Sequence, residues 1–380
     1  MLNDFVKEAK EIFGKGYIPL HRPVFNGNEK KYLTECINNN FVSSVGNKVT
    51  EFEKKIAKFV GARYAVATVN GTNALHIAIK LAGVKPGDEV ITQALTFVAT
   101  CNAITYAGAN PVFVDVDKDT MGLSPYALIN FLQKNAEKRS DGIYNKKSGK
   151  KITACIPMHT YGFPCRIKKI CNICKKWGIA VVEDAAESLG SYVDKKHTGT
   201  FSLIASLSFN GNKIITTGGG GMIITNNFKL AKRAKHITTT AKIPHPYEFV
   251  HDEIGYNFRM PNINAALGCA QIEQLDTFLL KKKKLANHWK NFFEKKKKNI
   301  IKPLKGNKAN YWLNSVVFIS KRERDNFLNF TNKKGVMTRP IWRLMSELKM
   351  FEICQNDGLK NSLWLQDRVV NIPSSVPKNF

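Results

Sequence analysis

One lysine of this chain differs from the others because of its neighbours. Lys213 follows a short polar stretch, residues 208–212, and shortly precedes a run of four glycines at residues 218–221. Upstream, the apolar residues 179–182 are typical of a buried strand, which ends at the acid Asp184. An acid at a strand end and a lysine beside a hydroxyl and a glycine-rich turn are what pyridoxal phosphate needs. The amine of Lys213 would form a Schiff base with the cofactor, and the carboxylate of Asp184 would pair with its pyridinium nitrogen.

Two further segments offer contacts for the phosphate of such a cofactor. In the Asn-Gly-Thr-Asn stretch at residues 70–73, the glycine allows close backbone approach and the helix start provides free N–H groups. Gly71, Thr72 and Asn73 are therefore candidate phosphate contacts, and the hydroxyl of Ser208 is another. A capped strand-to-helix turn is also common without a ligand, so the motif carries weight only beside Lys213.

An aromatic residue and a second acid complete the candidate set. Phe97 follows a predicted strand and could lie flat on a cofactor ring, although a phenylalanine taken alone is more often a core residue. Glu187 would share a helical face with Asp184 if a helical turn begins at residue 185. Its carboxyl group could then reach the ring oxygen, with a shared proton relieving the repulsion between the acids. The plain alternative for Asp184 is a strand-end acid or a helix cap.

The elements that would position these residues alternate between short apolar runs and helical patterns. Strands are predicted at residues 64–69, 89–92, 111–116, 152–158, 179–183, 205–209 and 222–225. Helices are predicted at residues 72–82, 98–107, 125–137 and 167–177. This alternation predicts an α/β fold in which helices cover both faces of a mostly parallel sheet. Such sheets bind ligands at the carboxyl ends of their strands, which is where Asn70, His159 and Asp184 fall.

The chain has room for two domains. Residues 138–151 are polar and predict an exposed excursion. From about Gly255 the pattern changes to a helix-like run at residues 264–279, a lysine-rich segment, and further strands and helices. We expect an N-terminal arm and a large cofactor-binding domain at residues 1–250, and a smaller C-terminal α/β domain at residues 251–380.

Composition narrows the class of protein. The chain has 380 residues, of which 43% are hydrophobic, as in a globular protein. No apolar run reaches membrane length and no signal-peptide pattern occurs, so we expect a soluble cytoplasmic protein without a membrane partner. The formal charge of +28 could indicate nucleic acid, an anionic membrane surface or an anionic small substrate. Because the lysines are scattered, we expect no nucleic-acid partner and a solvated helix face for the runs at residues 281–284 and 295–298.

The eight cysteines suit reduced thiols in a long chain of this kind. Cys171 and Cys174, with Cys165 nearby, have the spacing of half a zinc site, but a second Cys or His pair is missing. Since they fall in an amphipathic helical pattern, we expect them to pack as small apolar residues, and we expect no metal.

Together these segments resemble the nucleotide-sugar aminotransferases of the DegT/DnrJ/EryC1/StrS family, which are pyridoxal phosphate enzymes of the aspartate aminotransferase fold (type I). The resemblance runs from about Phe41 to the C-terminus. It covers, in order, residues 70–76, 96–100, 108–115, 159–162, 183–190, 208–221 and 255–268. Each segment alone is moderately specific, but their order is highly specific. The resemblance implies a mostly parallel seven-stranded sheet in the large domain.

The resemblance also implies roles for individual residues. It agrees with the roles given above to the lysine, the two acids, the aromatic residue and the phosphate contacts, namely Lys213, Asp184, Glu187, Phe97, Gly71, Thr72 and Ser208. Asn257 matches an asparagine that reaches the cofactor phosphate of the other subunit, which implies a homodimer with shared active sites. Many relatives have glutamine or histidine at the position of Glu187.

Within the family, residues 338–343 and 371–375 are similar to the branch that acts on 4-keto-6-deoxy sugars, above all to enzymes of the bacillosamine and legionaminic acid routes. Their substrate is a UDP-linked 2-acetamido-4-keto-6-deoxy sugar. Trp342 and Arg343 are candidates to contact the nucleotide or its diphosphate, since a guanidinium suits paired phosphate oxygens. His159 is a further candidate substrate contact. A packing tryptophan and a surface arginine are the plain alternatives.

These implications predict a transaminase that works in two halves. L-glutamate would convert the cofactor to pyridoxamine phosphate and leave as 2-oxoglutarate, and the keto sugar nucleotide would then take the amine, with Lys213 moving the proton. A GDP- or dTDP-linked 3- or 4-keto sugar is an alternative substrate. A pyridoxamine-dependent sugar dehydratase is less favoured, because relatives of that type lack the lysine. A non-catalytic regulator or DNA binder would need an extra module or a degraded site.

Overall fold

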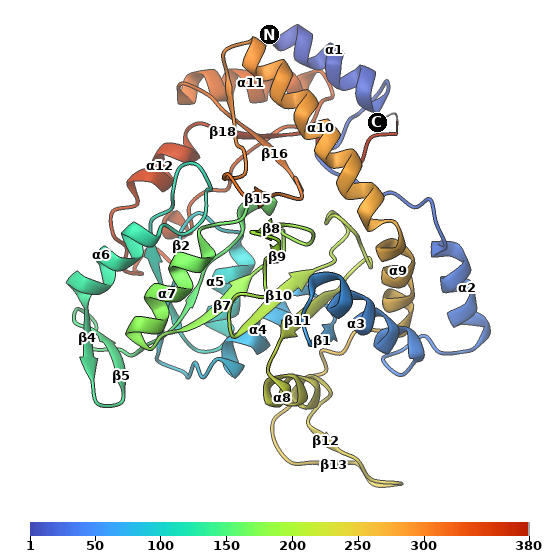
Figure 1. Ribbon diagram of the computed structural model, residues 1–380, viewed down its shortest axis with the longest axis vertical. Coiled ribbons are helices and arrows are strands. Elements are labelled where there is room, and N and C mark those ends of the chain that lie inside the picture. Colours follow the sequence, from blue (N-terminus) through green and yellow to red (C-terminus); the bar gives the residue numbers. More distant parts are fainter. Residues whose placement is uncertain (379–380) are drawn as a thin grey trace.

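The computed structural model describes residues 1–378, which are organised around one large mixed sheet (Figure 1). Its seven strands have the order β1-β11-β10-β7-β6-β2-β3. Strand β11 pairs antiparallel with β1 and β10, and the other neighbours pair parallel. The strands are β1 (Tyr64–Thr68), β2 (Glu89–Gln93), β3 (Asn110–Val114), β6 (Ile152–Ile156), β7 (Ala180–Asp184), β10 (Ile204–Ser208) and β11 (Gly221–Thr225). Each overlaps a strand predicted from an apolar run, so the mostly parallel α/β sheet is confirmed.

Helices cover both faces of this sheet because successive strand residues point to opposite sides and both sides are apolar. In β11, Ile223 packs in a cluster with Ala234 of α8, whereas Ile224 packs in a cluster with Phe52 of α3. The helices of the first face are α4 (Gly71–Leu81), α5 (Val98–Tyr106) and α8 (Phe228–Thr238), and those of the second are α3 (Asn47–Val60), α6 (Pro125–Asn135), α7 (Ile167–Trp177) and α9 (Asn262–Glu273). In α7, Cys174 packs in the core as predicted, beside Cys165.

The C-terminal part of the chain forms a second, smaller lobe, which lies above the large sheet in Figure 1. Its sheet has the antiparallel order β14-β16-β18-β17. The elements are β14 (Asn299–Ile300), β16 (Asn314–Val317), β17 (Arg339–Pro340), β18 (Val369–Ile372), α10 (Leu275–Lys295), α11 (Lys321–Lys333) and α12 (Lys360–Gln366).

Two helices lie across the boundary that the sequence predicts at residue 250. The first helix, α1 (Leu2–Phe13), packs in the C-terminal lobe, where the ring of Phe5 lies 5.3 Å from that of Trp289 and 4.9 Å from that of Phe327. Helix α9 follows residue 250 but packs against α2 (Glu29–Asn38) and α3. The domain boundary at residue 250 therefore stays a prediction, because these two helices each pack against elements from the other side of it.

The lysine-rich helix α10 is only partly a solvated face. Lys283 and Lys284 are exposed, but Lys282 is fully buried, and its Nζ donates hydrogen bonds to the carbonyl oxygens of Trp312 and Ser374. Helical spacing places Lys282 on the same face as the buried Trp289. The prediction of a fully solvated lysine run was wrong at this residue, because identical side chains in a row fall on different faces of a helix.

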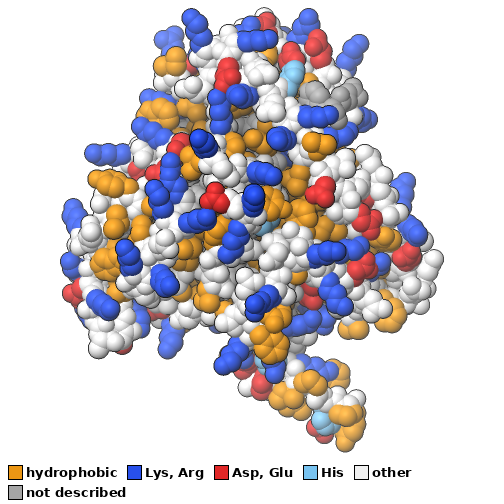
Figure 2. Space-filling model, viewed as in Figure 1, with side chains coloured by type: hydrophobic (Ala, Val, Ile, Leu, Met, Phe, Trp, Pro, Cys, Tyr) orange, Lys and Arg blue, Asp and Glu red, His pale blue; other side chains and the backbone are white. Residues whose placement is uncertain are grey.

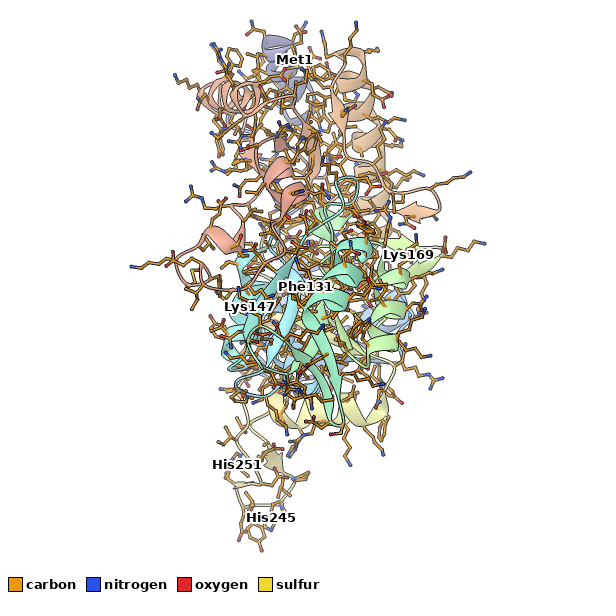
Figure 3. The ribbon with its side chains drawn as sticks, turned by 90° about the vertical axis from the view of Figure 1, so that its left-hand side faces the viewer. Met1, Phe131, Lys147, Lys169, His245 and His251 are labelled. Carbon is orange, nitrogen blue, oxygen red and sulfur yellow. The ribbon has the colours of Figure 1, made fainter. Side chains whose placement is uncertain are left out.

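Short hairpins decorate the two lobes. The predicted excursion forms the hairpin of β4 (Ala136–Arg139) and β5 (Gly142–Asn145), and a small sheet joins β8 (Tyr192–Val193), β9 (Lys196–His197) and β15 (Asn307–Lys308). The hairpin of β12 (Lys242–Ile243) and β13 (Val250–His251) projects from the end opposite Met1 (Figure 3).

The surface carries the excess of basic residues without a single dense patch on the face shown in Figure 2, where lysines and arginines are spread over both lobes among acids and apolar side chains. Within residues 1–378, no helix combines the length and the apolarity that a membrane span requires.

Candidate active site

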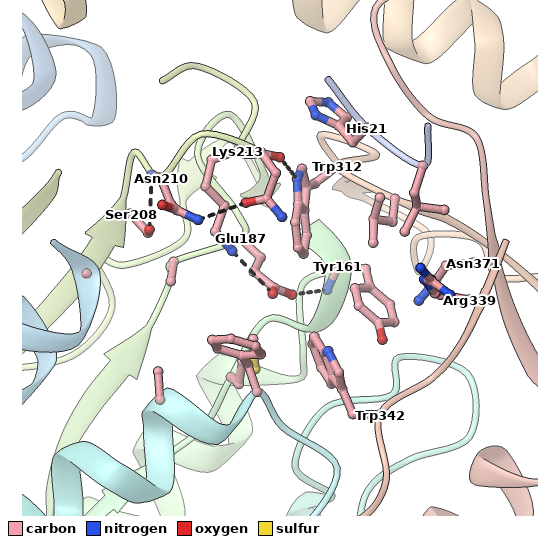
Figure 4. A pocket seen from close by; sticks show the side chains of 18 of the residues that line it. His21, Tyr161, Glu187, Ser208, Asn210, Lys213, Trp312, Arg339, Trp342 and Asn371 are labelled. Atoms are coloured by element: carbon pink, nitrogen blue, oxygen red, sulfur yellow. Dashed lines mark hydrogen bonds and ion pairs between the residues drawn. The ribbon is translucent and has the colours of Figure 1, made fainter. Parts of the chain in front are cut away.

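A cavity of 760 Å³ lies where the carboxyl ends of the parallel strands meet the C-terminal lobe. It collects most of the residues singled out from the sequence (Figure 4). The predicted residues that line it are Gly71, Thr72, Phe97, Asp184, Glu187, Ser208, Lys213, Trp342 and Arg343. Side chains that are far apart in the sequence thus share one enclosed space.

Lys213 lies in the turn after β10 and points into this cavity. Its Nζ is 3.4 Å from Oε1 of Glu187 and 3.9 Å from the ring centre of Trp312. The indole N–H of Trp312 donates to the carbonyl of Asn212 at 2.6 Å, which fixes the ring beside the lysine. The amine is therefore held between a carboxylate and an aromatic face, with its side chain 12% exposed.

Asp184 ends β7 and is held in one orientation by two hydrogen bonds. Its Oδ2 accepts from the hydroxyl of Thr100 at 2.7 Å, and its Oδ1 accepts from the N–H of Ala186 at 3.2 Å. Thr100 is 2.8 Å from the hydroxyl of Thr96. Burial raises the pKa of Asp184. A buried carboxylate of this kind gains from a cationic partner, and a protonated pyridine nitrogen is such a partner.

Glu187 stands between Lys213 and Tyr161. Its Oε2 accepts from the backbone N–H of Tyr161 at 2.8 Å, while Oε1 faces the lysine. Burial raises the pKa of Glu187 to about 7, against the opposing effect of the Lys213 charge. The carboxyl group can therefore carry a proton at neutral pH, as the expected contact with a ring oxygen requires.

The start of α4 forms an anion-binding corner with the end of β10. The N–H groups of Gly71 and Thr72 are in the first turn and have no acceptor within the helix. A side chain at Gly71 would place its Cβ 2.8 Å from Cβ of Ser208, so only glycine allows this approach. The N–H of Asn73 donates to Oδ1 of Asn70 at 2.8 Å. Asn73 therefore serves the helix cap and does not line the cavity.

Phe97 precedes α5 at the wall of the cavity and is 47% exposed, which is unusual for a large apolar side chain. Its ring lies 6.1 Å from that of Trp342. An exposed aromatic face at this place is available to a planar ligand.

Besides Asn73, two of the predicted site residues lie outside the cavity. His159 is fully buried: its Nε2 is 3.0 Å from Oε2 of Glu183, and its Nδ1 accepts from the N–H of Cys165 at 3.2 Å. The prediction that His159 contacts substrate was therefore wrong for this structure, since both ring nitrogens are engaged below the site. Asn257 is exposed and pairs through its backbone with Thr239, so its contact with a second subunit stays a prediction.

Several cavity residues had no predicted role. Those with a polar or aromatic side chain include His21, Tyr161, Trp312, Arg339 and Asn371. Tyr161, Arg339 and Asn371 lie in segments that carry the family resemblance. The resemblance therefore pointed to these segments, but no role was assigned to these three side chains. His21 and Trp312 come from stretches without a recognisable motif.

The groups around the cavity match pyridoxal phosphate in kind. Backbone N–H groups and the Ser208 hydroxyl suit a phosphate, a buried carboxylate suits the ring nitrogen, an open aromatic face suits the ring, and an amine is available for a covalent bond. The residues that could hold the cofactor are Gly71, Thr72, Phe97, Asp184, Glu187, Ser208 and Lys213.

Comparison with known proteins gives a consistent result. The model of the DegT/DnrJ/EryC1/StrS aminotransferase family matches residues 24–377. A GDP-perosamine synthase of Escherichia coli O157:H7 is 37% identical over 94% of this chain and 93% of its own, and one of Vibrio cholerae is 31% identical over 94% of each. Among solved structures, the PLP form of the sugar aminotransferase homologue Spr1654 of Streptococcus pneumoniae shares the fold, with a TM-score of 0.84 at 20% identity, and covers 94% of this chain and 93% of that one.

Proposed function

Because the chain belongs to the DegT/DnrJ/EryC1/StrS aminotransferase family, we propose that it transfers an amino group from L-glutamate to C4 of a nucleotide-linked 4-keto-6-deoxy sugar. The family makes it a sugar-nucleotide aminotransferase whose cofactor is pyridoxal phosphate. The observation that carries the proposal is the cavity in which Lys213 faces Glu187 and lies near the buried Asp184.

Each side chain then has a defined task. Lys213 would attach the cofactor covalently and, once released, would take the proton from the carbon of the amino donor and later give one to the sugar carbon. Asp184 would keep the ring nitrogen protonated. The bound cofactor supplies an electron sink for the pair released with that proton.

The surrounding residues orient the reacting groups. Gly71, Thr72 and Ser208 would hold the phosphate, and Phe97 would lie against the ring. Glu187 holds a proton beside the ring oxygen, which its pKa of about 7 permits. Trp312 limits the positions of the free amine, because its ring is fixed through Asn212.

Trp342 and Arg343 are proposed to meet the nucleotide side of the substrate. The side chain of Arg343 is 73% exposed at the rim, and its one ion pair within residues 1–378 is a 3.8 Å contact to Glu347, four residues on. Such an exposed pair is weak, so the guanidinium is available to a diphosphate.

Relatives give a preference among nucleotides. The C-terminal segments led us to expect a UDP-linked 2-acetamido sugar of the bacillosamine or legionaminic acid type. Two relatives that the chain covers over nine tenths of their length are GDP-perosamine synthases, at 37% and 31% identity. We therefore rank a GDP-linked 4-keto sugar first, and keep the UDP-linked sugar as the second candidate.

The test is a substrate panel. Purified protein with cofactor and L-glutamate is incubated with GDP-, UDP- and dTDP-linked keto sugars, and products are identified by mass spectrometry and NMR. An amino sugar and stoichiometric 2-oxoglutarate are expected, most rapidly with the GDP-linked sugar. Loss of a sugar hydroxyl without gain of nitrogen would show a dehydratase instead and would contradict the proposal.

A homodimer with shared sites is part of the same proposal. Asn257 would reach the cofactor phosphate of a second copy, and its exposure on the single chain is compatible with that. Sedimentation of the purified protein at several concentrations measures the state, and a monomer with full activity would remove this part of the proposal.

A further inference from the structure

The amine of Lys213 is confined by two groups that come from different parts of the chain. Glu187 lies in the loop after β7 of the large sheet, and Trp312 lies in the C-terminal segment between β15 and β16. Oε1 of Glu187 is 3.4 Å from Nζ of the lysine, the ring centre of Trp312 is 3.9 Å from it, and Figure 4 shows both side chains beside it. The position of the amine therefore depends on how these two segments are joined.

Asn310 joins the two segments through both polar atoms of its side chain. The residue is 1% exposed, and its Nδ2 donates to the carbonyl oxygens of Glu187 at 2.8 Å and of Leu189 at 2.9 Å. Its Oδ1 accepts from the backbone N–H of Trp312 at 2.8 Å. Its own backbone N–H donates to Oγ of Ser191 at 3.0 Å. One buried amide thus makes hydrogen bonds to both residues that flank the lysine.

Both flanking residues are also held at their side chains, so a bond to the backbone fixes the whole residue. The indole N–H of Trp312 donates to the carbonyl of Asn212 at 2.6 Å, and Oε2 of Glu187 accepts from the N–H of Tyr161 at 2.8 Å. Tyr161 has a φ of 54°, a left-handed conformation that is uncommon for a residue with a side chain. Such a conformation persists where the surrounding contacts determine it, and here it directs the N–H at the acid.

A glycine leaves room for this amide, in the segment at residues 159–162. Gly162 has a φ of 89°, and a Cβ at this position would overlap Oδ1 of Asn310 and lie 3.1 Å from the carbonyl oxygen of Glu187. The hydroxyl of Ser191 donates to the carbonyl of Gly162 at 2.7 Å. The close approach of Asn310 therefore gives a physical reason for glycine at residue 162.

We propose that Asn310 is a positioning residue of the active site. By bonding to Glu187 and to Trp312 at once, it sets the separation between the carboxyl group and the indole ring that confine the amine of Lys213. The inference rests on the proposed function only in taking Lys213 as the reacting amine. The alternative is that Asn310 stabilises the loop at residues 187–191 without affecting the lysine.

The acid beside the lysine distinguishes these two roles. Burial raises the pKa of Glu187 to about 7, while the charge of Lys213 and the N–H of Tyr161 lower it and Asp184 raises it further. Asn310→Ala removes the bond to the carbonyl of Glu187 and leaves a space that water can enter. If Asn310 holds the acid in its buried position, the pKa of Glu187 should therefore fall toward the ordinary value of 4.5.

The test is fluorine NMR of the apoprotein labelled with fluorinated tryptophan. The resonance of Trp312 is the one that is absent from Trp312→Phe, and its shift is followed from about pH 5 to pH 9. We expect a titration step near pH 7 in the wild type and no such step in Glu187→Gln. In Asn310→Ala the midpoint should lie at least about one pH unit lower.

Asn145→Ala is the matched control. Asn145 is also fully buried, and its amide donates at 2.7 Å to Glu89 and to Gln355, but it does not line the cavity. Its loss should leave the midpoint within about 0.3 pH unit of the wild type. Asn310→Ser retains one hydroxyl, so it provides a milder variant should the alanine protein not fold, with a smaller shift in the same direction. A wild-type midpoint in the folded Asn310 variants would overturn the assignment.

A rate measurement keeps this inference separate from the proposed function. The amine of Lys213 condenses with the aldehyde of pyridoxal phosphate with loss of water, and absorbance follows this step without amino donor or sugar. Asn310→Ala should slow it by at least about tenfold, because the amine is misplaced. Adding Glu187→Gln should lose less than the product of the two single effects, since both changes act on one group. Slower condensation in a protein that aminates no sugar would support the positioning role while the proposed function fails, and an unchanged rate or independent effects would contradict the role.

Discussion

At the scale of single residues, the site depends on one buried acid and one amine that face each other. Oε1 of Glu187 lies 3.4 Å from Nζ of Lys213, and burial raises the pKa of Glu187 to about 7. An acid that titrates near neutrality beside the reacting lysine links the protonation of the site to the pH of the solution. This link can be measured without substrate.

The substitution Glu187→Gln should remove a pH-dependent term from stability. The folded pKa of about 7 lies above the ordinary value of 4.5, so the folded protein binds the extra proton between these values. The contribution of Glu187 is then fully present below the lower value and is lost as the pH rises through the upper one. Urea unfolding of the apoprotein gives the free energy of unfolding of wild type and of Glu187→Gln at each pH. The wild-type value minus the variant value should fall by roughly 3 kcal/mol between about pH 4.5 and pH 8. A difference that stays constant with pH would contradict the burial argument.

Residues were predictable where a side chain followed a recognisable strand end. Asp184 ends β7, Lys213 lies in the turn that follows β10, and both line the cavity. His159 also follows a strand, but its ring nitrogens contact Glu183 and the N–H of Cys165 below the site. The sequence does not show whether a histidine at a strand end will contact other protein groups or a ligand. Lys282 was taken for a surface residue because burial of one lysine in a run depends on what packs against that face.

At the scale of elements, the approach of α4 to β10 determines the phosphate corner. Gly71→Ala should weaken cofactor binding by roughly 5- to 100-fold, because its Cβ would lie 2.8 Å from Cβ of Ser208 and force the helix start away. Fluorescence titration of the apoprotein with pyridoxal phosphate measures this. Gly219→Ala is the control, since the nearest atom to its Cβ would be 3.6 Å away. Equal affinity of both variants would show that the close approach is not needed.

The elements of the large sheet were predictable because each strand is a short apolar run between helical patterns. The pairing of β17 with β18 in the C-terminal lobe was not predictable in this way. β17 has two residues, and Arg339 meets Asn371 only through pairing with a strand some thirty residues away. Pairing of this kind depends on tertiary packing, so the local sequence pattern does not predict it.

At the scale of the whole molecule, the cavity is closed by both lobes, and the N-terminal helix belongs to the lobe that the C-terminal residues build. The ring of Phe5 in α1 lies within 5.3 Å of Trp289 and 4.9 Å of Phe327. The N-terminal helix α1 therefore completes the core of the smaller lobe, and no local sequence pattern predicts this packing.

Phe5→Ala should lower the free energy of unfolding by about 3–5 kcal/mol, because it empties a fully buried site among aromatic rings. Phe228→Ala is the matched control, since that ring is 61% exposed, and it should cost less than about 1 kcal/mol. Denaturant unfolding of both variants provides the comparison. Equal small losses would show that α1 does not stabilise the C-terminal lobe.

The central claim is that Lys213 carries the cofactor, and one measurement tests it most directly. The protein is loaded with pyridoxal phosphate and reduced with borohydride, which makes a lysine–cofactor link permanent, and peptides are then sequenced by mass spectrometry. We predict one modified residue per chain, at Lys213, and no modification of this site in Lys213→Ala. Modification of a different lysine, or a Lys213→Ala variant that retains full activity, would contradict the account.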